Sequence, residues 1–345
     1  MATAFISPFK NDSNSYIELQ KELFRDCGMS VSPLSFKTLA STNLVELFNP
    51  DNLLVFNWIE NRAFKKVGQN ARVSFPGLLV WLIYYFVAKI SKARTIYFIH
   101  NHAVHDTTGF SLGFSKRLVK AFGRIAWKRI VHDPSFCQPY DAAYLPHPLY
   151  WKSDDQSTPI NWDKSAESVT PRTRILGAIR PYKGIENIIK CWPKGKRLTI
   201  SGSCSPTYLT SLRDLAIDAG VDRDIDIDGR FLSEAELKST LRETDILILP
   251  HNIESMLVSG MFFEAIGIVP IIIARPTPFM KWVETKSKSI ILFDQHDSLA
   301  KIIELANNRL RSIDQKSASE FATNEFGWEN CIKLYKKSLT GDVRL

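Results

Sequence analysis

The segment ILGAIRPYKGIENIIKCW, residues 175–192, decides the fold of the second half of the chain. Its first residues are apolar, which is typical of a buried strand. A turn with two cations and a glycine follows, at Arg180, Lys183 and Gly184. Apolar residues then recur at helical spacing from Ile185 onward. The segment therefore predicts a strand, a cationic loop and a helix.

The same alternation is repeated on both sides of this segment. In the first half we expect strands at 2–10, 52–60 and 93–101, and helices at 14–28 and 116–133, the second running into a short strand. In the second half we expect strands at 172–179, 196–202, 224–229, 245–250 and 269–274, and helices at 184–192, 207–220, 233–244 and 260–268. Such alternation forms parallel sheets. The predicted fold class is α/β, with two doubly wound Rossmann-like domains that face a cleft.

A polar segment without apolar periodicity, residues 150–170, separates the two halves and is the predicted linker. We therefore expect an N-terminal domain at 1–165, a C-terminal domain at 166–325, and a terminal helix at 326–345. Ligands of parallel sheets bind at the carboxyl ends of the strands. The residues that directly follow strands are thus the candidates for a site.

Arg180 and Lys183 follow the first strand of the second domain and precede a helix, where backbone N–H groups favour an anion. Arginine offers a planar fork to phosphate and lysine a point charge, while Gly184 allows a close approach to the backbone. The loop matches neither the P-loop nor the dinucleotide glycine motif. We interpret it as a clamp for a diphosphate; a solvated loop with ordinary cations is the alternative.

A second cluster lies about eighty residues later. Ser259 and Gly260 open a helix after a loop, and Glu264 follows one turn on. A carboxylate there accepts hydrogen bonds from ribose hydroxyls, or simply complements the helix dipole.

These motifs together resemble the donor-binding half of GT-B glycosyltransferases: IRPYKGIENII, ISG, IDGRFLSEAELKS, DILILP and SG…EAIGIVPII. The resemblance implies that Arg180 and Lys183 bind the diphosphate of a nucleotide sugar and that Glu264 binds its ribose. Retaining members usually carry a further glutamate eight residues before Glu264, where this chain has Met256.

The N-terminal half is similar to the same family. NSYIELQKEL resembles its N-P-Y helix start, IHNHAVHD its H-N-x-x-P-H-E motif, and LPHPLY its strand end before the linker. The full combination most resembles bacterial exopolysaccharide glycosyltransferases, including xanthan-type β-mannosyltransferases. By matching position, Asn14, Tyr16 and Asn101 are the implied acceptor-binding residues.

Three histidines fall within six residues, in the stretch FIHNHAVHD. If the enzyme inverts configuration, Asp106 is the candidate base, acting through His105; if it retains configuration, His100 touches the transferred sugar. Structural histidines and a metal site are the alternatives, but no fourth ligand is evident for zinc. The DRDIDID segment alternates with isoleucines, which favours a half-buried strand over a metal-binding motif. We therefore expect no obligatory metal and no cofactor beyond the nucleotide-sugar co-substrate.

The formal net charge is +8, and it is concentrated between residues 62 and 129, which hold thirteen lysines and arginines against one acid. An apolar stretch at 78–88 lies inside this window and is too short to span a bilayer. It is either a buried helix or an interfacial one. The interfacial interpretation inserts four aromatic side chains into the bilayer and places three cations at the headgroups: Trp81, Tyr84, Tyr85 and Phe86, with Lys89, Lys92 and Arg94.

Scattered cysteines and a first segment unlike a signal peptide favour a reducing, cytoplasmic location. The predicted function is transfer of a hexose, from a GDP-mannose or UDP-glucose type donor, to a lipid-linked saccharide acceptor at the inner, anionic face of the cytoplasmic membrane. An epimerase or phosphorylase on the same fold is the alternative. A nucleic-acid partner is disfavoured, because no aromatic platform or binding motif accompanies the basic window.

Overall fold

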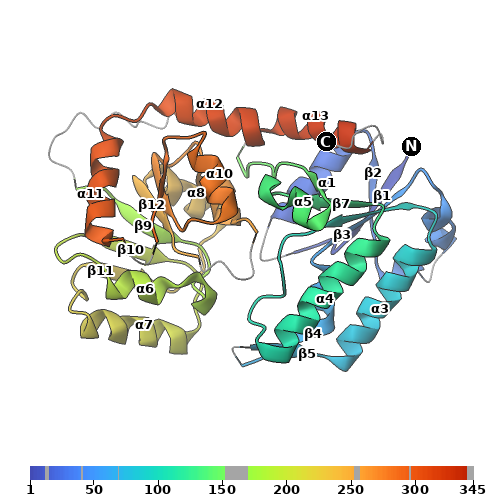
Figure 1. Cartoon of the computed structure of the whole chain (residues 1–345), viewed down its shortest axis with the longest axis horizontal. Helices are drawn as coiled ribbons and strands as arrows, with labels where there is room; N and C mark the ends of the chain where they lie inside the picture. Colours follow the sequence, from blue (N-terminus) through green and yellow to red (C-terminus); the bar gives the residue numbers. More distant parts are fainter. Residues whose placement is uncertain are drawn as a thin grey trace. The chain divides into compact units, whose positions relative to one another are not determined.

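The computed structural model of the chain describes residues 1–11, 15–39, 42–68, 70–151, 170–251, 257–294 and 297–339. These residues form two compact units (Figure 1). The first unit holds the described residues of 1–150, 257–258 and 328–339; the second holds those of 151–251, 259–294 and 297–327. The boundary predicted at 165 and the predicted linker therefore fall almost wholly outside the described residues.

The first unit is built on a parallel sheet of six strands in the order β2-β1-β3-β6-β7-β8. These strands are Ser30–Pro33, Thr3–Ser7, Leu53–Asn57, Arg94–Phe98, Lys128–Val131 and Ala143–Tyr144. Its helices are α1 (Tyr16–Asp26), α2 (Phe36–Leu39), α3 (Phe75–Ile90), α4 (Gly109–Ile125), α5 (Cys137–Tyr140) and α13 (Trp328–Leu339).

Both faces of this sheet are buried. Leu54 and Phe56 of β3 pack on the side of α3 and α4, whereas Leu53 and Val55 pack on the side of α1 and α13. The alternation follows from the two-residue period of a strand. Helix α13 is held in this unit by the Trp328 indole, which donates to the carboxylate of Asp26 at 2.8 Å.

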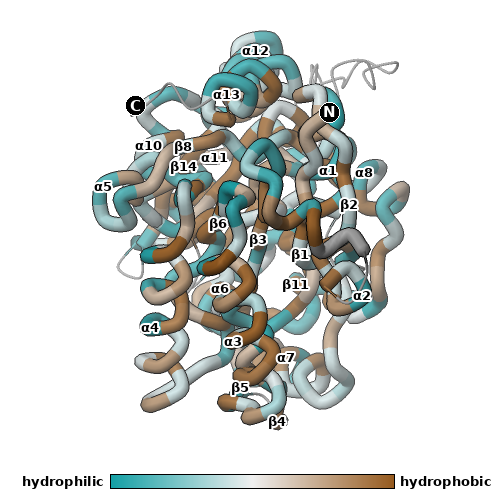
Figure 2. The backbone as a smooth tube through the Cα atoms, turned by 90° about the vertical axis from the view of Figure 1, so that its right-hand side faces the viewer, coloured by the Kyte–Doolittle hydropathy of each residue, from teal (hydrophilic) through white to brown (hydrophobic). Residues whose placement is uncertain are grey.

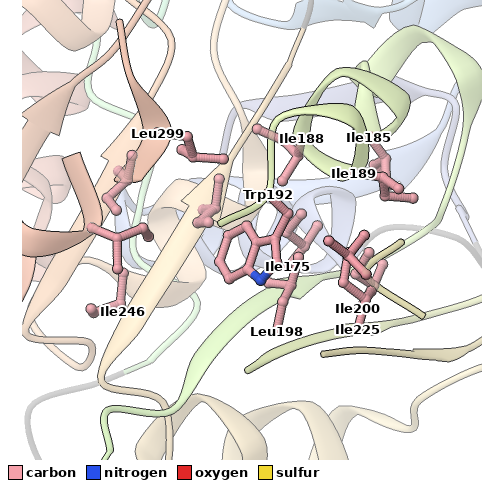
Figure 3. Packing of buried hydrophobic residues seen from close by; sticks show 14 of the residues in the cluster. Ile175, Ile185, Ile188, Ile189, Trp192, Leu198, Ile200, Ile225, Ile246 and Leu299 are labelled. Carbon is pink, nitrogen blue, oxygen red and sulfur yellow. The ribbon is translucent and has the colours of Figure 1, made fainter. Parts of the chain in front are cut away.

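The second unit repeats the plan, with strand order β11-β10-β9-β12-β13-β14. These strands are Ile225–Asp228, Leu198–Ser201, Thr173–Leu176, Ile246–Leu249, Ile271–Ala274 and Ile290–Leu292. Its helices are α6 (Ile185–Lys190), α7 (Pro206–Asp218), α8 (Glu234–Arg242), α9 (Gly260–Ala265), α10 (Pro278–Glu284), α11 (Leu299–Leu310) and α12 (Gln315–Phe326). Figure 3 shows its isoleucine-rich core, in which Ile185 and Ile189 of α6 pack with Ile200 of β10.

Two doubly wound parallel sheets confirm the predicted fold class. The aspartates of DRDIDID also lie as expected, since Ile225 and Ile227 are buried and Asp226 is exposed on β11. A two-stranded antiparallel hairpin of β4 (Phe64–Val67) and β5 (Asn70–Val73) was not predicted. It is too polar on both faces to give an apolar strand pattern.

Helix α3 corrects the predicted interfacial set. Trp81 and Tyr84 are buried, because they pack into the core around Phe122, so neither can enter a bilayer. Arg94 donates to the Leu339 carbonyl and stacks on an indole. Phe86 of the predicted set is exposed, and it belongs to a face with five large apolar side chains: Phe75, Leu79, Leu82, Phe86 and Ile90. The hydropathy colouring of the backbone in Figure 2 shows that helix α3 as a whole consists largely of apolar residues. None of the described helices is long and apolar enough to span a bilayer.

Candidate functional site

The loop after β9 is shaped by its glycine. The chain passes through an extended Arg180 into the 3₁₀ turn Pro181–Lys183, and then into α6 through Gly184 at a φ of 69°. A Cβ at Gly184 would lie 3.3 Å from the Pro250 carbonyl oxygen. The left-handed conformation and this close approach both favour glycine.

Lys183 is the most unusual residue of the loop. It is only 8% exposed, and burial, followed by the charge of Arg180, lowers the pKa of its ammonium to about 8. No carboxylate among the described residues forms an ion pair with it. A Cβ built at Gly177 would lie 3.6 Å from Nζ of Lys183 and 2.9 Å from Cε of Met261, a residue of α9. The space next to Gly177 is therefore bounded by both side chains. The lysine therefore lies where the loop after β9 meets the start of α9.

Arg180 is fixed in the same region. Its Nη1 donates to the carbonyl oxygens of Ile179, at 2.9 Å, and Ser203, at 2.8 Å. These bonds tie the guanidinium to the loop that follows β10. Gly202 in that loop comes so near Gly177 that a Cβ would lie 2.3 Å from the Gly177 carbonyl oxygen. The close approach of Gly177 and Gly202 thus brings the loops after β9 and β10 together next to Arg180 and Lys183.

The second predicted cluster lies on α9. Ser259 is buried at the N-cap without a side-chain capping bond, and Gly260 is the first helical residue. Burial, followed by the negative charge of Glu234 on α8, raises the pKa of Glu264 to about 7, against an opposing effect of Lys238. Both α6 and α9 have only six residues, so the side-chain charges carry more weight here than the helix dipoles.

A separate pocket of about 210 Å³ opens beside this loop. Gly184 contributes to its wall, together with residues of α6 and the segments after β12, β13 and β14, such as Pro250, Arg275 and Phe293. Neither Arg180 nor Lys183 lines it. We therefore place the candidate anion site at the two cations and not in this pocket.

In the first unit, His100 follows β6 and is 7% exposed. Its ring stacks on Trp58, with centroids 4.1 Å apart, and its Nε2 lies 2.9 Å from Oδ1 of Asn57. Burial, followed by the charges of His132 and His147, lowers its pKa well below the ordinary value. The imidazole is therefore neutral at pH 7.

Tyr16 contacts the same histidine, with ring centroids 5.0 Å apart, but it is 1% exposed and its hydroxyl lies 2.9 Å from Nε2 of His132. This burial disfavours direct contact with an acceptor. Asn101 is also buried beside His100. Asn14, the third implied acceptor residue, lies outside the described residues, as does Met256.

The structure places His105 and Asp106 on the loop toward the β4–β5 hairpin. Asp106 has a φ of 59°, its carbonyl accepts from the Ala71 amide, and its carboxylate lies 3.6 Å from Nζ of Lys66. Burial lowers the pKa of His105, although Asp106 opposes this shift. The pair is thus adjacent to surface cations of the hairpin.

Sequence reasoning missed three side chains beside His100, namely Gln20, Asn57 and His132. One signal was present: Asn57 ends a buried strand and is followed by Trp58, a combination that matches the position of functional residues in parallel sheets. The left-handed backbone of Trp58, at a φ of 47°, could not be inferred from the sequence. Among the described residues, no group of histidine, cysteine and acidic side chains is arranged to hold a metal ion.

We compared the chain with protein families, with curated sequences and with solved structures. No protein-family model and no curated protein sequence matches the chain. Solved structures do match: Alr3699/HepE from Anabaena in complex with UDP-glucose has 12% identity and a TM-score of 0.65, covering 99% of each chain. Sucrose-phosphate synthase from Thermosynechococcus elongatus has 15% identity and a TM-score of 0.63, covering 97% of this chain and 82% of that one.

The galactosyltransferase WaaB of the lipopolysaccharide outer core, in its apo form, has 10% identity and a TM-score of 0.61, covering 99% of this chain and all of that one. At such identities the likeness concerns the fold. The chain has the GT-B fold of glycosyltransferases, as its motifs predicted. The narrower resemblance to xanthan-type enzymes stays a prediction.

Proposed function

We propose that the protein is a glycosyltransferase that moves a hexose from a nucleoside-diphosphate sugar to a lipid-linked saccharide acceptor. The observation that carries the proposal is Lys183, a buried cation with no ion-pair partner among the described residues, beside the fixed guanidinium of Arg180. A buried charge is costly unless it is paired. A diphosphate supplies that partner and, as the leaving group, gains negative charge that both cations stabilise during transfer.

The other roles are proposed from the resemblance of the motifs. Glu264 accepts the ribose hydroxyls, and His100 of the first unit contacts the saccharide. UDP is the first candidate nucleotide because Anabaena Alr3699/HepE, which has a similar fold, was solved in complex with UDP-glucose. GDP is the alternative that the sequence resemblance leaves open.

Thermal unfolding with UDP, GDP, ADP and TDP tests the site. A nucleotide at a hundred times its dissociation constant stabilises the folded state by about 2.7 kcal/mol. We expect one nucleotide to raise the Tm, Lys183→Met to abolish the rise, and Lys196→Met, an exposed lysine of the same unit, to keep it. A flat response to all four nucleotides would remove the support for a donor site. Conversion of the nucleotide sugar to its epimer, with no new glycosidic bond to an added acceptor, would favour an epimerase. Formation of a sugar 1-phosphate from a glycoside and inorganic phosphate would favour a phosphorylase.

The acceptor's lipid is inferred from helix α3. Its exposed apolar side chains are spaced by four, three, four and four residues, so they form one stripe along the helix, and Phe75 is 81% exposed. Exposed cations from the hairpin and from the neighbouring α4 accompany the stripe: Lys65, Lys66, Arg72, Lys116, Arg117, Lys120 and Arg124. A surface that inserts apolar side chains between lipids and carries basic residues beside them is suited to an anionic bilayer. Each such cation contributes about 1 kcal/mol to the free energy of membrane binding.

Vesicle sedimentation tests this docking. We expect binding to vesicles that contain phosphatidylglycerol and weak binding to pure phosphatidylcholine. Phe86→Ser should weaken the binding, whereas Ile217→Ser, an equally exposed apolar residue on α7 of the second unit, should not. Equal losses in both variants would count against a surface on α3.

A further inference from the structure

Five buried side chains form one hydrogen-bonded chain across the first unit. They come from α1 and from the carboxyl ends of β3, β6 and β7: Tyr16, Gln20, Asn57, His100 and His132. All five are more than nine-tenths buried. The chain begins at the backbone carbonyl of Leu145, which lies 2.7 Å from Nδ1 of His132.

The carbonyl fixes the direction of every bond that follows. A carbonyl can only accept, so Nδ1 of His132 carries a hydrogen, and a neutral ring then has a lone pair on Nε2. The Tyr16 hydroxyl must therefore donate to that Nε2, at 2.9 Å. Its oxygen in turn accepts from Nε2 of Gln20, at 3.1 Å.

The orientation of the Gln20 amide then sets the end of the chain. Its oxygen accepts from Nδ2 of Asn57, at 2.7 Å. Oδ1 of Asn57 is left to accept, from Gln20 at 3.3 Å and from Nε2 of His100 at 2.9 Å. His100 consequently has its hydrogen on Nε2 and a lone pair on Nδ1.

The reverse direction requires a second hydrogen on His132. Tyr16 would then donate to a flipped Gln20, and His132 would have to donate from both nitrogens as an imidazolium. Burial opposes this, since it lowers the pKa of His132 to about 4. Among the described residues, the titratable groups that face His100 are Tyr16, His132 and His147, and none of these three supplies a negative charge at pH 7.

The plane of the His100 ring is fixed as well. Trp58 stacks on it at an interplanar angle of 21°, and the His100 carbonyl accepts from the Leu257 amide. Trp58 keeps this position in a left-handed backbone conformation that is unfavourable for a bulky residue. Such strain is retained where surrounding structure demands it, and it concentrates at functional sites.

We propose that Gln20, Asn57, Tyr16 and His132 are positioning residues that hold His100 in the Nε2–H tautomer and present Nδ1 as an acceptor to a sugar hydroxyl. In the part of the chain that the structure describes, Nδ1 of His100 has no hydrogen-bond partner. A ligand that donates a hydroxyl is thereby selected over one that only accepts. The tautomer follows from the hydrogen-bond geometry and the neutral state of His132; the identity of its ligand rests on the proposed function.

The test uses the full chain labelled with [15N]histidine and long-range 1H–15N correlation spectra at pH 7.5. His100→Gln and His132→Gln assign the two rings by loss of their signals. We expect the Nε2–H pattern at His100 and the Nδ1–H pattern at His132. An Nδ1–H or mixed pattern at His100, or an imidazolium pattern at His132, would overturn the proposal.

Asn57→Asp adds a second measurement. A carboxylate keeps the acceptor but stabilises the imidazolium, so the pKa of His100 should rise by about one to three units. Asn49→Asp, an exposed asparagine of the same unit, should leave it unchanged. An unchanged value in Asn57→Asp would contradict the coupling. If this variant does not fold, the spectra of the unaltered chain still decide the tautomer.

Saturating UDP-glucose tests the ligand. We expect the Nδ1 resonance of His100 to move, and an unmoved resonance in protein that UDP-glucose demonstrably stabilises against heat would contradict the sugar contact. If UDP-glucose gives no thermal stabilisation, the proposed function fails. The tautomer is then judged on the spectra without ligand.

Discussion

The surroundings of His100 in the first unit and of Lys183 in the second differ in how their buried polar groups are satisfied. In the first unit, the hydroxyl, amide and imidazole groups around His100 form hydrogen bonds with one another. In the second, Lys183 is buried without an ion-pair partner among the described residues, and Glu264 has a raised pKa. A network that is satisfied internally rigidifies its surroundings, whereas an unpaired buried charge is stabilised only by something that binds. The hydrogen bonds of the first unit hold the His100 ring in position, whereas the ammonium of Lys183 in the second unit is left to pair with a bound anion.

The largest expected effect is that of Lys183→Met. A hydrogen bond to a charged group contributes about 1.5–3 kcal/mol, so nucleotide affinity should fall about 10- to 150-fold. The free energy of unfolding without nucleotide should not fall, because burial already penalises the ammonium. Isothermal titration calorimetry and urea unfolding measure the two quantities, with Lys196→Met as the control. A clear loss of stability with intact affinity would make Lys183 a structural residue and remove the contrast between the units.

Tyr16→Phe should show the reverse. Loss of the hydroxyl leaves Nε2 of His132 and one N–H of the Gln20 amide without a partner, which costs about 1–3 kcal/mol of unfolding free energy. Nucleotide affinity should not change, because Tyr16 belongs to the other unit. Tyr85→Phe is a matched control, since Tyr85 is only partly buried and makes ring contacts rather than this bond. If Tyr16→Phe were as stable as the unaltered chain, the network would not be a source of rigidity.

The same contrast explains what the sequence could predict. The strands with continuous apolar runs, such as Ile246–Leu249, and the loop RPYKG were recognisable because their signals are local. Burial of Lys183 and the chain from His132 to His100 depend on residues far apart in sequence, as Tyr16 and His132 are. No local pattern encodes such contacts. The predicted face of α3 was wrong at Trp81 and Tyr84 for a similar reason, because almost all of that helix is apolar and only packing decides which side is covered.

The pH dependence of nucleotide affinity gives a smaller effect. The pKa of Lys183 is about 8 in the free protein, and a bound diphosphate favours the ammonium. The contribution of Lys183 to affinity should therefore be constant below that value and weaken about tenfold per pH unit above it, until the higher pKa of the complex is reached. Titrations at pH 8.5 in buffers of different ionisation enthalpy should show proton uptake. Lys183→Arg should abolish both the uptake and the slope; a slope that persists in this variant would assign the titration to another group.

Glu264→Gln should have the smallest effect and the sharpest signature. Replacing an ionised acceptor of ribose hydroxyls by an amide costs about 1 kcal/mol, or about fivefold in affinity. Because hydroxyl donation favours the carboxylate and its pKa is about 7 in the free protein, affinity for UDP should rise between pH 6 and pH 7.5. The variant should lose this rise and bind UDP and 2′-deoxy-UDP alike, whereas the unaltered chain prefers UDP. Glu284→Gln, at an exposed position on α10, serves as the control. If Glu264→Gln still distinguished the two nucleotides, the ribose would be held elsewhere, and the raised pKa of Glu264 would reflect only its burial and the charge of Glu234 at the start of α8.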